Sequence, residues 1–228
     1  MTALGVVTGT AAEARCLPRP GAGLAVAIAG ADAGRAEAAA TRLIASGAGM
    51  LISIGVAGGL APDLAPGTVI LASEIIAPDG VRHVPSPGMR AALAAAFDGP
   101  PPLNGALAGS DDVVASVAAK RALFAATGAL AVDTESHAVA AVATRGSTPF
   151  AALRVVVDPA ERALPRAALV AVGADGALRP FRLLAALCRR PSDLSALVAL
   201  GGEWRLARSG LTRAGLALSG LFGGGGGL

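Results

Sequence analysis

The sequence predicts an α/β domain in which helices cover both faces of a central sheet. Short apolar runs, many of them β-branched, alternate along the chain with alanine-rich segments of helical length. Glycine or proline bounds the short runs, as is typical of strands. Apolar strands that alternate with helices indicate a sheet buried between two helical layers. The 228 residues suit one such domain with a single core.

The first half of the chain supplies four expected strands and one expected helix. Leu4–Thr8 and Leu24–Ile28 are short apolar runs, and we expect both to be strands. Ala33–Ser46 has the length of a helix and carries its charged residues on one polar face. Met50–Ile54 and Thr68–Ser73 are expected strands on either side of a glycine-rich loop, GVAGGLAPD.

The middle of the chain continues the alternation. Ala115–Thr127 is an expected helix, followed by a strand at Ala129–Val132 and a helix at Ser136–Thr144. Phe150–Val157 (FAALRVVV) is the clearest strand of the chain, because it is apolar, β-branched and ends abruptly at Asp158 and a proline.

The segment after Pro165 has a different composition and is expected to be mainly helical. The expected helices are Ala167–Val172, Arg179–Arg190 and Leu194–Gly220. The residues after Asp158 hold nine arginines and four acids, a net charge of +5. These helices either pack on the sheet or form a basic amphipathic surface that meets anionic lipid or an apolar substrate. We expect one domain over residues 1–222, with 166–222 as its basic helical part and 223–228 as a flexible glycine tail.

Composition excludes several classes of protein. Hydrophobic residues make up 54% of the chain, which excludes intrinsic disorder, and the 31 glycines show no collagen period. Only 3% of residues are aromatic and none is tyrosine, so a base-stacking nucleic-acid platform is not expected.

Cysteine usage and hydropathy point to the cytoplasm. Cys16 and Cys188 lie far apart and belong to no metal-binding or redox motif, as expected of thiols in a reducing compartment. The longest uncharged stretch, Leu43–Pro62, has the length of a membrane span, but its glycines favour a strand that enters a turn. We expect a cytoplasmic protein, with peripheral contact to the inner membrane left open.

Common catalytic motifs are absent. The sequence has no P-loop, no dinucleotide-binding GxGxxG after the first strand and no GxSxG nucleophile elbow. The two histidines, His83 and His137, are too few for a zinc site, so no metal is expected. His137 is expected to be a packed or surface residue, and His83 lies in a loop rich in proline and glycine.

Carboxylates at strand ends are the remaining candidates for chemistry. Glu13 follows the first strand and serves either as a base or as a favourable charge in the first turn of a helix. The turn after Ile54 brings backbone N–H groups close to a sugar or an anion, or is a turn without a ligand. Asp133 and Glu135 flank Thr134 and either cap a helix or bind a ligand. Asp158 ends a strand, although Asp-Pro is also a common turn signal.

The order and spacing of these segments resemble the purine and uridine phosphorylase superfamily, which includes methylthioadenosine/S-adenosylhomocysteine nucleosidases. The similar segments, from residue 4 to about residue 165, are LGVVTGTAAEAR, SIGVAGGLAPDLAPGTVI, GSDDVVAS, AVDTESHAVAAVA and ALRVVVDPA. The resemblance implies a three-layer αβα fold with a mixed central sheet. It also implies a homodimer or a higher oligomer.

One branch of this superfamily, the hopanoid-associated phosphorylases, is the most similar. The EAR segment that begins at Glu13, the short loop around His83, DPAERALP and the arginine- and leucine-rich C-terminus resemble that branch. The branch implies release of adenine from adenosylhopane, a nucleoside with a polycyclic lipid substituent, in hopanoid side-chain synthesis. The alternatives are a methylthioadenosine/S-adenosylhomocysteine nucleosidase and a non-catalytic relative that binds nucleoside or lipid.

The resemblance also assigns roles residue by residue. Asp158 protonates the leaving purine at N7, and Glu13 activates the attacking water. Glu135 binds the ribose hydroxyls, and the backbone around Val113 and Val114 meets the base. The remaining substrate contacts are Thr134, Val56, Ala57 and Gly58. Gly9 and Arg15 are expected to bind phosphate, which as a co-substrate takes the place of water. The resemblance implies no other cofactor.

Departures from the family pattern bear on the nucleophile and the substrate. Val56 stands where the superfamily usually has a serine or threonine, so a hydroxyl for phosphate or ribose is missing. Thr134 replaces the usual methionine beneath the ribose, and Val113 occupies a position that often holds phenylalanine in the family. The segment from Ile75 to Gly105 is shorter than usual, which we expect to leave the 5′ side of the ribose open to a bulky apolar substituent.

Overall fold

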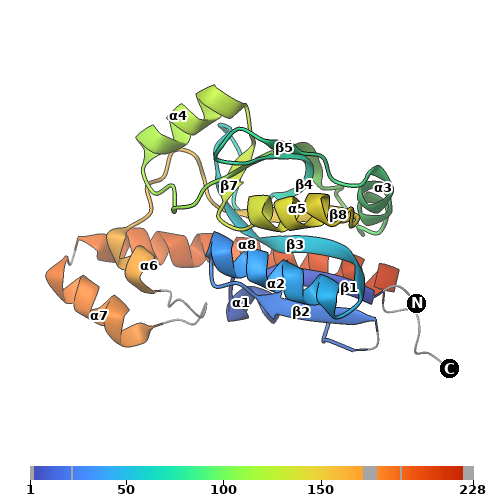
Figure 1. The fold of residues 1–228 in the computed structure, drawn as a ribbon. Helices are drawn as coiled ribbons and strands as arrows, with labels where there is room; N and C mark the ends of the chain where they lie inside the picture. The colour runs from blue at the N-terminus through green and yellow to red at the C-terminus, as the bar shows by residue number, and fades with distance from the viewer. Residues whose placement is uncertain (1–2, 22, 172–178, 191, 223–228) are drawn as a thin grey trace.

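The computed structural model describes residues 3–21, 23–171, 179–190 and 192–222 (Figure 1). Within these ranges the strands form one mixed sheet. Its strands are β1 (Ala3–Thr8), β2 (Leu24–Ile28), β3 (Ala48–Gly59), β4 (Val69–Ile76), β5 (Arg82–His83), β6 (Leu103–Gly109), β7 (Ala131–Asp133) and β8 (Phe150–Asp158).

The sheet brings together strand ends that are far apart in the sequence. β1 pairs in parallel with β2 and β3, and β3 also pairs in parallel with β8. The pairings β3–β7, β7–β6, β6–β4, β4–β8 and β8–β3 close into a ring. Gly58 of β3 is therefore the partner of both Val132 in β7 and Asp158 in β8. Because Asp133 follows Val132, the segments that carry the candidate acids meet at one end of the ring.

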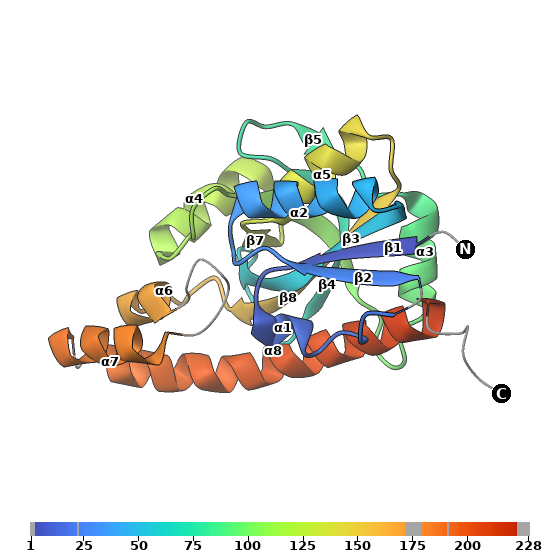
Figure 2. The same ribbon diagram turned by 60° about the horizontal axis from the view of Figure 1, so that its bottom comes forward.

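Helices cover both faces of this sheet. α2 (Ala33–Ala45) and α5 (Ser136–Arg145) lie on one face, and α1 (Ala11–Ala14), α3 (Pro87–Ala95) and α8 (Asp193–Phe222) on the other (Figure 2). The alanines of α2 and α5 pack on the first face, and their small side chains let the helices approach closely. The expected three-layer αβα fold with a mixed sheet is confirmed.

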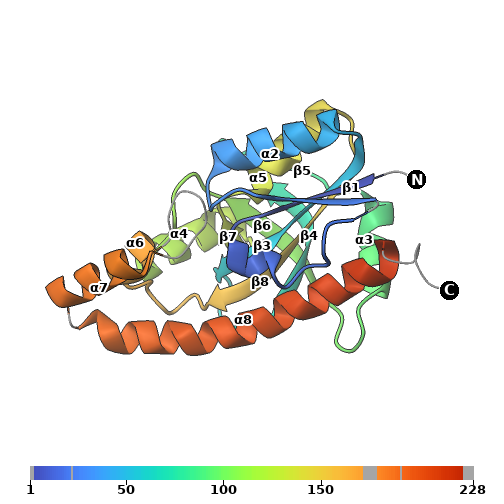
Figure 3. The same ribbon diagram turned by 90° about the horizontal axis from the view of Figure 1, so that it is seen from below.

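Three further helices lie around the end of the sheet that carries the acids. α4 (Val117–Thr127) follows the loop after β6, and α6 (Arg166–Ala171) and α7 (Pro180–Arg189) follow β8. α8 runs along the molecule from the neighbourhood of α6 and α7 to that of α3 (Figure 3). Its buried face, Ala207, Leu211, Ala214 and Leu218, packs against β-strand residues.

Local sequence explains where the helices begin. The side chains of Asp32 and Ser116 accept hydrogen bonds from the backbone at the starts of α2 and α4. Thr10 and Glu13 form a reciprocal capping box at α1. α4 ends at Gly128, which has φ +66°, a left-handed conformation that favours glycine.

The structure corrects several sequence-based expectations. The strand expected at Met50–Ile54 continues to Gly59, so the glycine segment is part of β3 and not a turn. Pairing with β8 and β7 holds it extended. α3, β5 and β6 were not expected, because proline and glycine interrupt that segment. The expected end of a helix at Val172 and the glycine tail lie outside the described residues.

In the described part of the chain, no helix combines the length and the apolar character that crossing a bilayer requires.

Candidate active site

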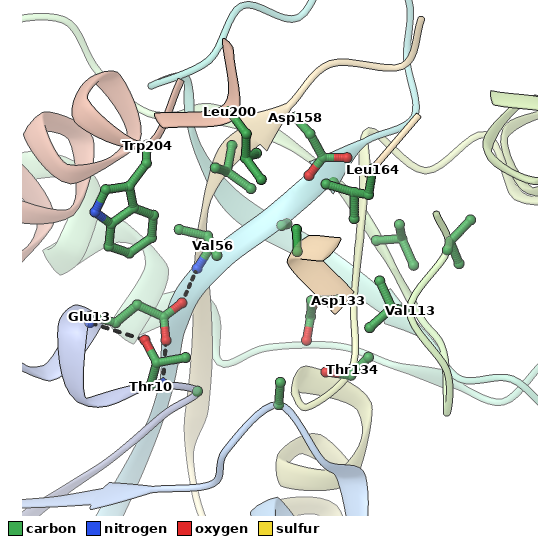
Figure 4. Close-up of a pocket in the computed structure, with 18 of the residues that line it drawn as sticks. Thr10, Glu13, Val56, Val113, Asp133, Thr134, Asp158, Leu164, Leu200 and Trp204 are labelled. Carbon is green, nitrogen blue, oxygen red and sulfur yellow. Dashed lines mark hydrogen bonds between the residues drawn. The ribbon is translucent and has the colours of Figure 1, made fainter. Parts of the chain in front are cut away.

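A cavity of about 470 Å³ lies at the carboxyl ends of the strands (Figure 4). One part is polar, with Thr10, Glu13, Asp133, Thr134, Glu135 and Asp158 in its wall. The other part is apolar, and the side chains that close it are Leu164, Ala168, Leu183, Leu197, Leu200 and Trp204. Clefts at the carboxyl ends of strands are the usual ligand sites of α/β sheets.

Glu13 is held rigidly although it sits in a helix of one turn. The backbone N–H of Val56 donates to Glu13 Oε1 at 2.8 Å, and the backbone N–H of Thr10 donates to Oε2 (Figure 4). Burial raises the pKa of Glu13 above 4.5, and the bond from Val56 and the charge of Arg154 only partly offset this effect. A buried carboxylate with a raised pKa is suited to accept a proton.

Arg154 is the centre of the polar half of the site. It is fully buried in β8, and its Nη2 donates to Ser53 Oγ at 2.8 Å and to Asp133 Oδ1 at 3.0 Å. Glu135 Oε2 lies 3.6 Å from the same nitrogen. One guanidinium therefore faces Asp133 and Glu135 directly, and its charge also acts on Glu13.

Asp133 is a structural member of this cluster. It accepts bonds from the backbone N–H groups of Glu135 and Ser136, at 2.8 and 2.7 Å, and from the Ser136 hydroxyl at 2.6 Å. Burial favours the neutral acid, but Arg154 and Ser136 outweigh it, and the pKa of Asp133 is lowered. The helix-capping interpretation therefore applies to Asp133.

Glu135 lies in the cavity wall and has a strongly raised pKa. Burial raises its pKa to about 8; Arg154 opposes the shift, while Asp133 and Glu13 add to it. The backbone N–H of Ala31 also donates to it, from a residue at φ 54°. Two carboxylates, Glu13 and Glu135, approach Gly9 so closely that a Cβ there would lie within 2.8 Å of both. Gly9 is thus required for this packing.

Asp158 lies across β3 from Glu13 and has a cationic partner of its own (Figure 4). Lys120 of α4 donates to Asp158 Oδ2, and both side chains are buried. Burial raises the pKa of Asp158 to about 6, and the ammonium of Lys120 opposes this rise. A carboxyl group that titrates near neutrality can both hold and release a proton under physiological conditions.

The structure brings together the residues that the sequence singled out, with one exception. The cavity is lined by Gly9, Glu13, Val56, Ala57, Gly58, Val113, Val114, Thr134, Glu135 and Asp158. Arg15 is exposed and does not line the cavity. Positions two apart on a helical turn point in different directions, so the turn that directs Glu13 inward directs Arg15 outward. The expectation that Arg15 holds phosphate in this cavity is therefore not met.

The segment from Ile75 to Gly105 was expected to border the 5′ side of the ribose and, being short, to leave it open, but it does not border this cavity. The room beyond the polar half is enclosed instead by α6, α7 and α8, through Ala168, Leu183 and Trp204.

Sequence reasoning missed two buried cations. Arg154 interrupts an otherwise apolar strand, and Lys120 is the only lysine of the chain. A charge in the middle of a buried strand requires a partner, and this signal could have identified Arg154. Lys120 carries no comparable signal, because an alanine-rich helix commonly exposes its lysines.

His83 and His137 share a second cavity, of about 390 Å³, with Asp79 and Asp111. His83 Nδ1 lies 3.1 Å from Thr144 Oγ1, and His137 Nε2 lies 3.4 Å from an Asp111 oxygen. Neither histidine lines the cavity that holds the candidate acids, so neither is positioned to contact a ligand bound there.

Comparison with solved structures gives relatives that share this fold. A methylthioadenosine/S-adenosylhomocysteine nucleosidase from Neisseria meningitidis, in complex with methylthio-immucillin-A, superposes with a TM-score of 0.73 at 17% identity, over 96% of this chain and 98% of that one. The corresponding nucleosidase from Colwellia psychrerythraea, in complex with adenine, gives 0.72 at 15% identity, over 97% and 96%. Futalosine hydrolase from Helicobacter pylori gives 0.62 at 20% identity, over 69% and 88%.

A search of curated protein sequences finds no significant match. The family model described as "Phosphorylase superfamily" matches residues 5–189, which include every candidate acid and most of the cavity wall. The chain belongs to the phosphorylase superfamily.

Proposed function

We propose that this protein hydrolyses the N-glycosidic bond of an adenine nucleoside and releases adenine. The observation that supports this most strongly is the placement of Glu13 and Asp158, both buried and both with a raised pKa, in the wall of one cavity. An acid and a base that flank one ligand are the requirement for cleaving a glycosidic bond. Solved structures with the same fold include nucleosidases with adenine or a nucleoside analogue bound.

The proposed reaction uses the two carboxyl groups at opposite ends of the breaking bond. Asp158 gives its proton to N7 of the purine as the bond between C1′ and N9 breaks, so the base leaves as neutral adenine. Glu13 takes a proton from the water that attacks C1′. Glu135 accepts hydrogen bonds from the ribose hydroxyls. The sugar passes through an oxocarbenium-like state, which the surrounding carboxylates stabilise by their negative charge.

Water is favoured over phosphate as the nucleophile by the charges of the wall. Among the described residues that line the cavity, five are acidic and none is basic. The N–H of Val56, in the glycine-containing part of β3, and the N–H of Thr10 already donate to Glu13. Arg154 does not line the cavity, and its Nη2 donates to Ser53 and Asp133. Among the described wall residues, no basic side chain is therefore placed to offset the charge of an entering anion.

The substrate is proposed to carry a large apolar substituent at its 5′ position, as adenosylhopane does. The apolar half of the cavity is lined by leucines and by Trp204, and it continues from the half that holds the acids. Such surface favours a hydrocarbon group by roughly 25 cal/mol for each Å² removed from water. Methylthioadenosine, the alternative substrate, has a single small group to place there.

Filling the apolar half is expected to separate these substrates. Ala168→Phe places a ring in that half, so adenine release from adenosylhopane should fall roughly tenfold or more, while release from methylthioadenosine should change little. Ala92→Phe, at an exposed position of α3, is the matched control. The measurement is adenine release by liquid chromatography. Equal losses on both nucleosides would contradict the assignment of the apolar half, and no adenine from any nucleoside would favour a non-catalytic relative.

The outer face of α7 is proposed to bind an anionic membrane, which would present a lipid-like substrate to the cavity. Phe181 is 85% exposed and Leu184 is also exposed, while Leu183 on the inner side lines the cavity. The residues of α7 include no acid, and Arg182 and Arg189 are exposed. A basic helix with an exposed apolar face is the usual form of an interfacial membrane anchor.

Vesicle binding tests this surface. The double substitution Phe181→Ser with Leu184→Ser should abolish most co-sedimentation with vesicles of phosphatidylcholine and phosphatidylglycerol, and high salt should weaken the binding of the unmodified protein. Val84→Ser removes another exposed apolar side chain and is the control. Equal binding by all variants would contradict the proposal. Loss of a dimer in the double variant, measured by analytical ultracentrifugation, would instead assign this face to a second copy of the chain.

A further inference from the structure

Lys120 is a buried cation that takes no part in any step of the proposed reaction. It is the only lysine of the chain, and it has no exposed surface. α4 otherwise packs lightly, and Lys120 is the one fully buried residue among those described in the helix. Burying an ammonium costs several kcal/mol of hydration unless it is paired and hydrogen-bonded.

All three protons of the ammonium have acceptors in the segment that carries the candidate acid. Lys120 Nζ donates to Asp158 Oδ2, to the carbonyl oxygen of Pro159 at 2.8 Å and to that of Arg162 at 2.9 Å. An ammonium has three donors, so this set is complete. Its acceptors lie in the acid itself and in the four residues that follow, which lead to Leu164 in the cavity wall.

Two further charged groups face this pair. Glu203 of α8 is buried, and its Oε1 accepts from Arg162 Nη1 at 3.0 Å. The charge of Glu203 acts on both Asp158 and Lys120, and burial raises the pKa of Glu203 itself. Asp158 is thus affected by a cation from α4 and by a more distant carboxylate from α8. Lys120 is the only one of these groups in hydrogen-bond contact with Asp158.

We propose that Lys120 is a positioning residue for the proposed hydrolysis: its ammonium fixes the Asp158 carboxyl group in the cavity and sets the pH range in which Asp158 acts as an acid. The proposal rests on the role of Asp158 in the proposed function. The direct bond to Oδ2 restricts the rotation of the carboxyl group, and the two carbonyl bonds hold the backbone on its C-terminal side. The ammonium stabilises the ionised carboxylate and makes the protonated form a stronger acid.

The direction of the effect follows from the charge. Asp158 must be protonated to act, so kcat/KM is expected to fall as the pH rises above the pKa of Asp158, near 6; a separate fall at low pH is expected where Glu13 becomes protonated. Removal of the ammonium takes away the main effect that opposes burial and raises the pKa of Asp158 further. The fall in kcat/KM then begins at a higher pH, while the low-pH kcat decreases because the acid is weaker.

Three substitutions separate charge from packing. Lys120→Gln keeps hydrogen-bond donors for the two carbonyl groups but removes the charge. Lys120→Met removes both, and Lys120→Arg keeps the charge. We expect the Gln and Met variants to move the descending limb of the pH profile up by about one unit or more, and to lower the low-pH kcat roughly tenfold. The Arg variant should keep the limb near its original position.

The control is Arg121→Gln, which removes a cation from the adjacent, exposed position of the same helix and should leave the profile unchanged. If the Met variant does not fold, the Gln variant still carries the test. In an Asp158→Asn background, Lys120→Gln should cause no further loss of turnover. A Gln profile that superposes on that of the unmodified protein would overturn the role of Lys120. Full turnover in Asp158→Asn alone would overturn the proposed acid instead, so the two failures are distinguishable.

Discussion

Asp158→Asn is expected to lower kcat for adenine release by roughly 10²–10⁴-fold, the range by which a general acid accelerates a reaction. Asparagine has nearly the same shape and keeps a hydrogen-bonding oxygen, but it has no proton to give to N7. Binding of adenine should therefore change by a much smaller factor than turnover. Steady-state kinetics and calorimetric titration with adenine measure the two effects separately.

The control for this substitution is Glu161→Gln, three residues further along the chain and exposed. It removes a carboxylate near the site without touching the cavity wall and should leave turnover unchanged. The residual activity of Asp158→Asn should also lose the fall above about pH 6, since the group that titrates there is gone. Unchanged kcat in Asp158→Asn would remove Asp158 from the mechanism.

Arg154→Met is expected to destabilise the protein by about 3–5 kcal/mol, the cost of removing one partner from a buried ion pair. Methionine fills much of the space but leaves Asp133 without its cation and Glu135 without its nearest positive charge. Glu13 loses the same electrostatic support. Denaturant unfolding at neutral pH measures the change in the free energy of unfolding.

The pH dependence of this loss has a definite sign. Arg154 lowers the pKa of Asp133 in the folded protein, so the pair contributes stability above the unfolded value near 3.8 and loses it as the pH falls below that value. The difference between the variant and the unmodified protein should therefore persist down to about pH 4 and shrink below it. Arg145→Met, which breaks an exposed pair with Glu37, is the control and should cost at most about 1 kcal/mol. A loss for Arg154→Met no larger than this would contradict the central role of Arg154.

Much of the polar half of the site was predictable from sequence because it lies at strand ends. Glu13, Glu135 and Asp158 each follow a short apolar run, and the carboxyl ends of strands in such a sheet meet at one edge. The turn expected after Ile54 was wrong, because glycine weakens a strand on its own, and only the partners on either side show that Gly55–Gly59 stays extended.

The remaining parts depend on contacts between distant segments. The pairing of Lys120 with Asp158 joins residues 38 apart, and that of Arg154 with Ser53 joins residues 101 apart. No local pattern predicts such pairs. The apolar half could not be predicted from local sequence either. The composition after Asp158 shows its excess of arginine, but Leu200 and Trp204 line the cavity only because α8 packs along the sheet.

The most direct test of the proposed hydrolysis is the identity of the sugar product. Purified protein is incubated with adenosylhopane, with and without inorganic phosphate, and the products are analysed by mass spectrometry. The absence of a basic residue among the described residues of the cavity wall predicts equal rates of adenine release in both reactions and a free ribosyl product in each. Adenine release that requires phosphate and yields a ribose 1-phosphate product would contradict the account.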